Sequence, residues 1–112
     1  MDASGKESEA GHALNTDEEL YARFLCGEDD AMRQLMDRYL DRLTLFCFTF
    51  LHSVTEAEDM ALDAFAVIAM KRSTWYGGSF RRWLYRIARN LSISRFRKLR
   101  LVQASFDEAH HL

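Results

Sequence analysis

Arginine side chains recur along residues 80–100 at a spacing that suits contact with a polyanion. Placed on a helix at 100° per residue, these arginines share one face: Arg82, Arg86, Arg89, Arg97 and Arg100. Asn90 lies at the margin of this face. A guanidinium donates two parallel hydrogen bonds to a phosphate or a guanine edge, and an asparagine can pair with an adenine edge in the same way. The pattern predicts a nucleic-acid-binding face; the alternative interpretation is a solvated surface.

Two large aromatic residues, Trp75 and Tyr76, stand directly before Gly77 and Gly78. Glycines let the backbone approach a ligand closely, and aromatic rings beside a basic helix are suited to stacking on unpaired bases. Stacking is worth about 1–3 kcal/mol per base, which is close to the few kcal/mol needed to extrude a base from a duplex. We therefore predict that this loop holds an unpaired base. The alternative is that Trp75 covers the core.

The segment before this loop presents two different helical faces. Met60, Ala61, Ala64, Phe65 and Ile68 share the apolar face and are predicted to be buried. The opposite face mixes carboxylates with apolar side chains: Asp59, Leu62, Asp63, Ala66 and Met70. Such a mixture is typical of a protein-binding patch, although scattered surface hydrophobic residues are also common.

No pattern predicts an enzyme, a metal site or a cofactor. The four histidines are scattered, and we find no phosphate-binding loop and no pairing of a nucleophile with a base. Cys26, Cys47 and His52 are conceivable metal ligands, but both cysteines fall in apolar helical settings, where a core role is expected.

Composition and charge order narrow the function further. The 112 residues include no proline and only five glycines, which favours helices. Residues 1–63 hold fifteen acidic and five basic side chains, whereas residues 64–106 hold ten basic side chains and no acidic one. This division is typical of a protein that meets a polyanion with one half. With no secretory signal and no apolar run long enough to cross a bilayer, a cytoplasmic protein is expected.

The expected architecture is all-α, a compact bundle of four helices with a disordered N-terminal arm at residues 1–15. Helices are predicted from Asp17 to Gly27, from about Glu28 to His52, from Glu56 to Arg72 and from Ser79 or Phe80 to about Arg100, within a helical domain of residues 16–100. Thr55 is the predicted cap of the third helix, in a capping box with Glu58. Residues 101–112 are expected to begin a linker or tail. The buried face predicted for the last helix holds Phe80, Leu84, Ile87 and Leu91, flanked by Trp83, Ala88 and Ser94.

Several of these segments resemble region two of the extracytoplasmic-function sigma factors of bacterial RNA polymerase. The resemblance covers about residues 17–109, and these stretches carry it: Asp17–Leu20, Gly27–Asp29, Met32–Tyr39, Ala57–Phe65, Trp83–Asn90 and Ser105–Ala109. In that family, region two is a helical domain. One surface docks on the clamp helices of the largest polymerase subunit, and another recognises and melts the minus-ten promoter element.

The resemblance implies a DNA-binding transcription initiation factor that binds RNA polymerase core and the non-template strand of promoter DNA. An anti-sigma factor is a further candidate partner. The expected DNA-binding residues are Trp75, Tyr76, Arg81, Arg82, Arg86, Arg89, Asn90 and Arg97. The expected polymerase-binding residues are Asp59, Leu62, Asp63, Ala66 and Met70.

Two departures from the family pattern keep alternatives open. Leu62 stands where relatives usually have a glutamine, and a second helical domain, region four, does not follow within this sequence. One alternative is a sigma-like interaction module that binds polymerase or an anti-sigma partner without initiating transcription. Another is a general basic DNA-binding bundle.

Overall fold

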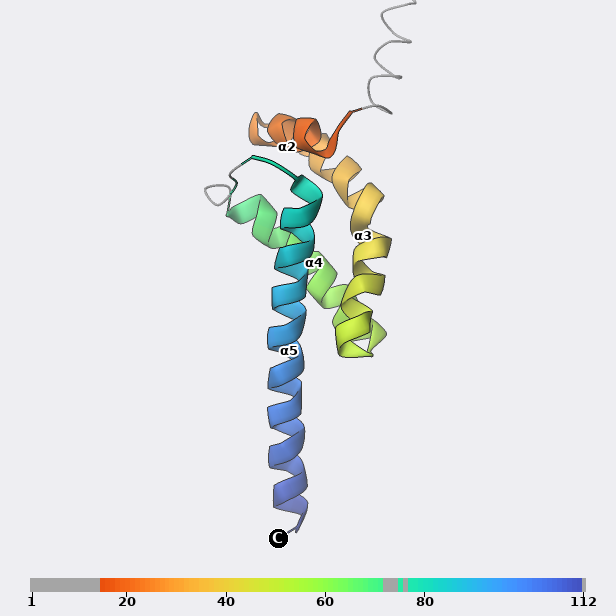
Figure 1. Cartoon of the computed structure of the whole chain (residues 1–112), viewed down its shortest axis with the longest axis vertical. Coiled ribbons are helices and arrows are strands. Elements are labelled where there is room, and N and C mark those ends of the chain that lie inside the picture. The colour runs from red at the N-terminus through yellow and green to blue at the C-terminus, as the bar shows by residue number, and fades with distance from the viewer. Residues whose placement is uncertain (1–14, 72–74, 76, 112) are drawn as a thin grey trace, which may run out of the picture.

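Four helices make up the computed structural model, which describes residues 15–71, 75 and 77–111 and omits the side chains of residues 110 and 111. They are α2 (Asp17–Leu25), α3 (Asp29–Leu51), α4 (Val54–Met70) and α5 (Phe80–His111), and no strand occurs within the described ranges. In Figure 1, α3 runs down one side, α4 returns behind α5, and α2 crosses the top. The predicted all-α class is confirmed. The predicted N-terminal arm lies outside the described residues except for Asn15.

α2 begins at Asp17, as predicted, but ends at Leu25, two residues before the predicted Gly27. The Thr16 hydroxyl accepts a hydrogen bond from the Glu19 amide at 3.1 Å, and the Glu19 carboxylate accepts one from the Thr16 amide at 3.3 Å. This reciprocal capping box satisfies amides that have no partner inside the helix. The chain leaves α2 through Gly27, whose φ of +105° is a left-handed conformation that glycine adopts without strain.

The prediction that Thr55 caps the third helix is wrong. α4 begins at Val54, and the Ser53 hydroxyl accepts a hydrogen bond from the Glu56 amide at 3.3 Å. α3 reaches Leu51 before His52 turns the backbone left-handed at a φ of +53°. Ser53 is therefore the residue with an extended backbone and a free hydroxyl at the turn, which is what an N-cap requires. The far end of α4 is also earlier than predicted, at Met70.

The core forms where the four helices face one another. Its fully buried side chains include Tyr21, Leu35, Leu43, Ile68, Phe80 and Leu84. On α5 the buried stripe runs through Phe80, Leu84, Ala88 and Ser92. Ile87 and Leu91 are half-buried, while Ser94 is exposed and not a flank of the core. These residues hold the first half of α5 against α3 and α4.

α5 is longer than predicted. It continues past Arg100 to His111, and Figure 1 shows its lower half running beyond the other helices. Residues 101–109 are exposed, so packing against the bundle does not explain their helical conformation. The local sequence does, because it contains neither proline nor glycine and Gln103 donates a hydrogen bond to Asp107 one turn later. No helix in the described part of the chain has the length and apolarity needed to span a membrane.

Candidate nucleic-acid interface and a groove between two helices

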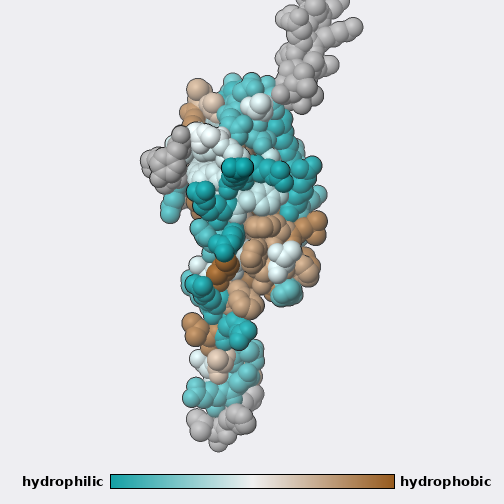
Figure 2. Space-filling model, viewed as in Figure 1, coloured by the Kyte–Doolittle hydropathy of each residue, from teal (hydrophilic) through white to brown (hydrophobic). Residues whose placement is uncertain are grey.

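α5 presents a row of cationic side chains to solvent between Arg82 and Arg100, as the sequence predicts. We call it the basic face; its exposed arginines are Arg82, Arg86, Arg89, Arg97 and Arg100, and the uncharged Asn90 is exposed beside them. None of these arginines forms an ion pair with a carboxylate of the described residues, where the paired guanidiniums belong to Arg23, Arg38 and Arg95. Figure 2 shows hydrophilic surface over the first turns of α5, beside apolar surface over the C-terminal half of α3. The basic face is therefore available to a polyanion.

Arg81 lies apart from the basic face. Its guanidinium stacks over the Tyr85 ring at 5.6 Å. Tyr85 itself is half-buried against α3, with ring centroids 4.9 Å from Phe46 and 6.3 Å from Tyr39. Tyr85 is thus next to exposed arginines along α5, but large aromatic rings of α3 cover it.

A pocket of about 240 Å³ lies where the basic face begins. It is lined by Trp75, Gly77, Ser79, Arg82, Trp83 and Arg86, and we call it the tryptophan pocket. The indoles of Trp75 and Trp83 lie 5.0 Å apart, centroid to centroid. The pocket thus combines two aromatic rings with two guanidiniums, the combination that binds a stacked base beside a phosphate.

Trp75 also packs onto the core, which was the alternative interpretation of the sequence. Its ring meets Tyr21 at 5.5 Å and Phe80 at 6.3 Å, and it is half-buried. The core therefore fixes one side of the indole, while the remaining side lines the tryptophan pocket. Tyr76, the second predicted aromatic residue of this loop, lies outside the described residues.

A second, shallower hollow of about 290 Å³ continues along the basic face. It brings together three predicted residues, Arg89, Asn90 and Arg97, with Ile93 and Ser94 between them. Ser94 was expected at the edge of the core and not at this surface. Its hydroxyl adds a donor and acceptor to a hollow that already offers the Asn90 amide.

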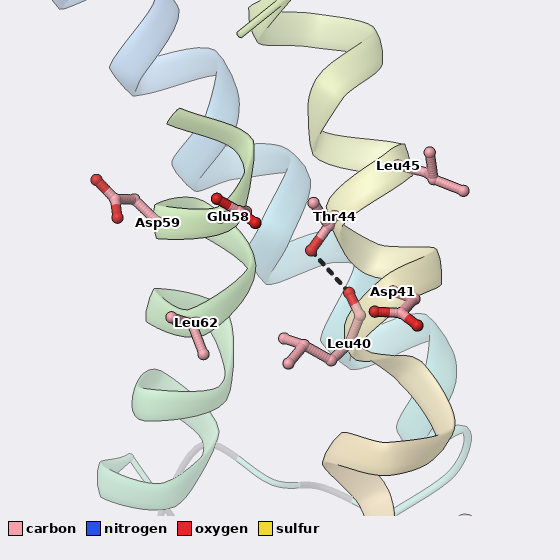
Figure 3. A pocket seen from close by; sticks show the side chains of 7 residues that line it. All are labelled: Leu40, Asp41, Thr44, Leu45, Glu58, Asp59 and Leu62. Carbon is pink, nitrogen blue, oxygen red and sulfur yellow. Dashed lines mark hydrogen bonds between the residues drawn. The ribbon is translucent and has the colours of Figure 1, made fainter. Parts of the chain in front are cut away.

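A groove of about 660 Å³ separates α3 from α4 and has the opposite charge. Its lining, drawn in Figure 3, comprises Leu40, Asp41, Thr44, Leu45, Glu58, Asp59 and Leu62. We call it the acidic groove. Leu40 points toward α4 and Glu58 faces α3, whereas Leu45 and Asp59 point outward at the two rims. An apolar floor inside an acidic rim suits a partner that offers apolar and basic side chains together.

The acidic groove contains only part of the patch predicted on α4. Asp59 and Leu62 line it, but Asp63, Ala66 and Met70 are exposed elsewhere on α4. The contribution of α3 was missed altogether. The available signal was Asp41 followed four residues later by Leu45, an acidic and an apolar side chain one turn apart on an exposed face.

Titratable groups in the interior are held in their neutral forms. Burial, together with a hydrogen bond to Asp17, raises the pKa of Tyr39 to about 12. Burial likewise raises the pKa of the Cys47 thiol. Neither group ionises near neutral pH, so neither is an activated nucleophile.

The family of the chain follows from comparison of its sequence with known families. The family model for sigma-70 region 2 matches residues 35–102. The chain belongs to this family. The match runs from the first half of α3 through α4 and the tryptophan pocket into the second half of α5, so it includes both the basic face and the acidic groove.

Two curated relatives are similar to much of the chain. The ECF RNA polymerase sigma factor SigW of Bacillus subtilis is 40% identical over 73 residues, which are 64% of this chain and 39% of the relative. The ECF RNA polymerase sigma factor BldN of Streptomyces coelicolor is 33% identical over 84 residues, 73% of this chain and 32% of the relative. The chain thus spans between a third and two fifths of the length of these relatives. No solved structure matches it significantly.

Proposed function

We propose that this region 2 domain acts in transcription initiation, binding the minus-ten element of promoter DNA on the basic face and RNA polymerase core in the acidic groove. The observation that carries the proposal is the tryptophan pocket, which places two indoles and two guanidiniums at the start of a helix with exposed arginines. The printed names of both relatives, RNA polymerase sigma factors, support the same role.

The tryptophan pocket has the size and chemistry to hold one unpaired base. Its volume of about 240 Å³ is below the range of about 300–1,000 Å³ that drug-sized ligands occupy. A base stacked on Trp75 or Trp83 would gain about 1–3 kcal/mol, which offsets most of the cost of leaving the duplex. Arg82 and Arg86 then bind the phosphates on either side of that base, which adds to the affinity for the opened strand.

The acidic groove is the proposed contact with the polymerase. Asp41, Glu58 and Asp59 repel DNA, so the two partners are directed to separate surfaces of the domain. Leu45 and Leu62 are 68% and 47% exposed, and covering them supplies the apolar part of the contact. The clamp helices of the polymerase's largest subunit are the proposed occupant.

In a second candidate function, the domain binds a protein partner in the acidic groove but does not bind DNA. The groove has an apolar floor and Leu62 in place of the glutamine that relatives usually carry, so it would also accept a helix of an anti-sigma factor. The domain would then be an interaction module that does not initiate transcription. Binding of DNA through the tryptophan pocket separates the two candidates.

The deciding experiment compares Trp75→Ala with the unchanged protein on two fluorescent DNA probes. One probe is an A·T-rich duplex with a short unpaired bubble, and the other is the same duplex fully paired. Base capture predicts that Trp75→Ala weakens bubble binding about tenfold and leaves paired-duplex binding within about twofold. An equal loss on both probes would identify a general DNA-binding bundle, and no preference for the bubble in the unchanged protein would favour the interaction module.

A further inference from the structure

α2 lies against the loop that carries Trp75 and against the first turn of α5. Its residues come more than fifty positions earlier in the chain and precede the region 2 match, which begins at residue 35. We propose that α2 positions the tryptophan pocket for base capture, with Glu18 as the positioning residue. The inference rests on the proposed function, because it concerns the same pocket.

Glu18 ties α2 to the start of α5. Its carboxylate accepts a hydrogen bond of 2.7 Å from the Phe80 amide, in a partly buried setting. That amide belongs to the first turn of α5 and has no acceptor within its own helix. The negative charge also complements the positive end of the α5 dipole. One side chain of α2 thus fixes where the basic face begins.

The residue before α5, Ser79, already caps this helix, so the contact with Glu18 is not needed to start it. The Ser79 hydroxyl accepts a hydrogen bond from the Arg82 amide at 3.2 Å. α5 can therefore start without help from α2. Glu18 adds a contact between residues that are 62 positions apart in the chain. We infer that this contact fixes where the first turn of α5 lies, whereas Ser79 is enough to keep that turn helical.

Tyr21 joins α2 to the last turn of α4 and to the two indoles of the tryptophan pocket. Its hydroxyl donates a buried hydrogen bond of 2.8 Å to the carbonyl of Ile68, in the last turn of α4. Its ring lies 5.5 Å from Trp75 and 5.4 Å from Trp83, centroid to centroid. Tyr21 is fully buried, so it forms the inner wall against which both indoles rest.

α2 is itself anchored to α3. The Asp17 carboxylate accepts hydrogen bonds from the Arg38 guanidinium, at 2.9 Å, and from the Tyr39 hydroxyl. Three side chains of one short helix, Asp17, Glu18 and Tyr21, therefore reach α3, the start of α5 and the end of α4. Displacement of α2 moves the indoles relative to Arg82 and Arg86, and the pocket loses the spacing that a base requires.

The test uses the intrinsic fluorescence of the protein, because the sequence contains two tryptophans and both line the pocket. Glu18→Ala is expected to shift the emission to longer wavelength as the indoles become more exposed, and to weaken binding of the bubble probe about tenfold. Binding of the paired duplex is expected to stay within about twofold. Glu18→Gln keeps a neutral acceptor for the Phe80 amide and is expected to restore the emission and most of the affinity.

The matched control is Glu28→Ala, which removes a carboxylate whose partner is Arg23 on the surface. It should leave both the emission and the bubble affinity unchanged. Unchanged emission in Glu18→Ala would overturn the inference while leaving base capture intact, and so would an effect of equal size in Glu28→Ala. A protein that binds both probes equally before any substitution contradicts the proposed function instead.

A measurement on the unchanged protein covers the case in which Glu18→Ala unfolds. The Phe80 amide is expected to exchange with solvent at least tenfold more slowly than an unbonded amide in the first turn of a helix. Fast exchange of this amide in the folded protein would show that the tie to Glu18 is absent and would overturn the inference.

Discussion

The basic face and the acidic groove lie on the same small bundle, but they are assembled in different ways. The basic face comes from consecutive turns of a single helix, α5, and the loop before it adds Trp75. The acidic groove needs two helices, since α3 supplies Asp41 and Leu45 while α4 supplies Asp59 and Leu62. The spacing of arginines along one helix survives movement of its neighbours, whereas the tryptophan pocket and the acidic groove depend on how separate segments pack.

The largest expected effect tests the basic face. Arg82→Ala combined with Arg86→Ala removes two phosphate contacts, each worth about 1.5 kcal/mol or more, so DNA affinity should fall about 100-fold. The slope of log affinity against log salt concentration should become shallower by about two. Fluorescence anisotropy over a salt series measures both quantities.

The control for this change is Arg33→Ala combined with Arg42→Ala, which removes two exposed arginines from α3. DNA affinity should then change by less than about threefold, because these residues lie in the acidic half of the chain. Equal losses from the two double variants would mean that only net charge matters and that the basic face is not a defined site.

An intermediate effect is expected in the acidic groove. Leu62→Ala removes an apolar side chain from the proposed polymerase contact, at a cost of about 1.5 kcal/mol, so binding to RNA polymerase core should weaken about tenfold. Affinity for DNA should not change. Surface-immobilised core enzyme and titrated domain provide the measurement.

Met70→Ala is the matched control for Leu62→Ala. Met70 is 81% exposed on the same helix but does not line the groove. We expect polymerase binding to be unaffected by this change. A loss equal to that of Leu62→Ala would support the larger patch predicted from the sequence, which includes Met70. It would contradict the proposal that the polymerase contact is confined to the acidic groove.

The smallest expected effect concerns the start of the helix that carries Glu58 and Asp59. Ser53→Ala removes the N-cap of α4 and should lower the free energy of unfolding by about 1 kcal/mol. Thr55→Ala alters an exposed side chain inside the helix and should cost less than about 0.5 kcal/mol. Urea titrations of the two variants give the comparison, and the reverse order would restore Thr55 as the cap.

Residues within one helix were predictable from the sequence because periodicity specifies a helical face. The arginines of the basic face and the buried residues Phe80 and Leu84 lie where the 100° spacing places them. The predicted start of α2 at Asp17 is also confirmed, and the structure adds a local reason for it, the capping box between Thr16 and Glu19.

Features that depend on two segments meeting were not predictable in this way. Nothing near Asp41 in the sequence indicates that it faces the same groove as Asp59, and the bond from the Phe80 amide to Glu18 joins residues far apart in the chain. The partial burial of Tyr85 is of the same kind, since it depends on rings of α3. The Thr55 error has a local cause: α3 ends at Leu51, His52 turns the backbone left-handed, and Ser53 is therefore the residue directly before α4.

The ion pair between Arg95 and Glu56 joins the middle of α5 to the start of α4, and α5 continues from it to His111. At 1.5 Å per residue, the far end of the helix lies about 24 Å beyond this ion pair. Residues 101–109 of this extension are exposed, so a partner could bind there without displacing the bundle. If the arginines of the basic face hold DNA as proposed, such a partner would be joined to the bound strand by one continuous helix.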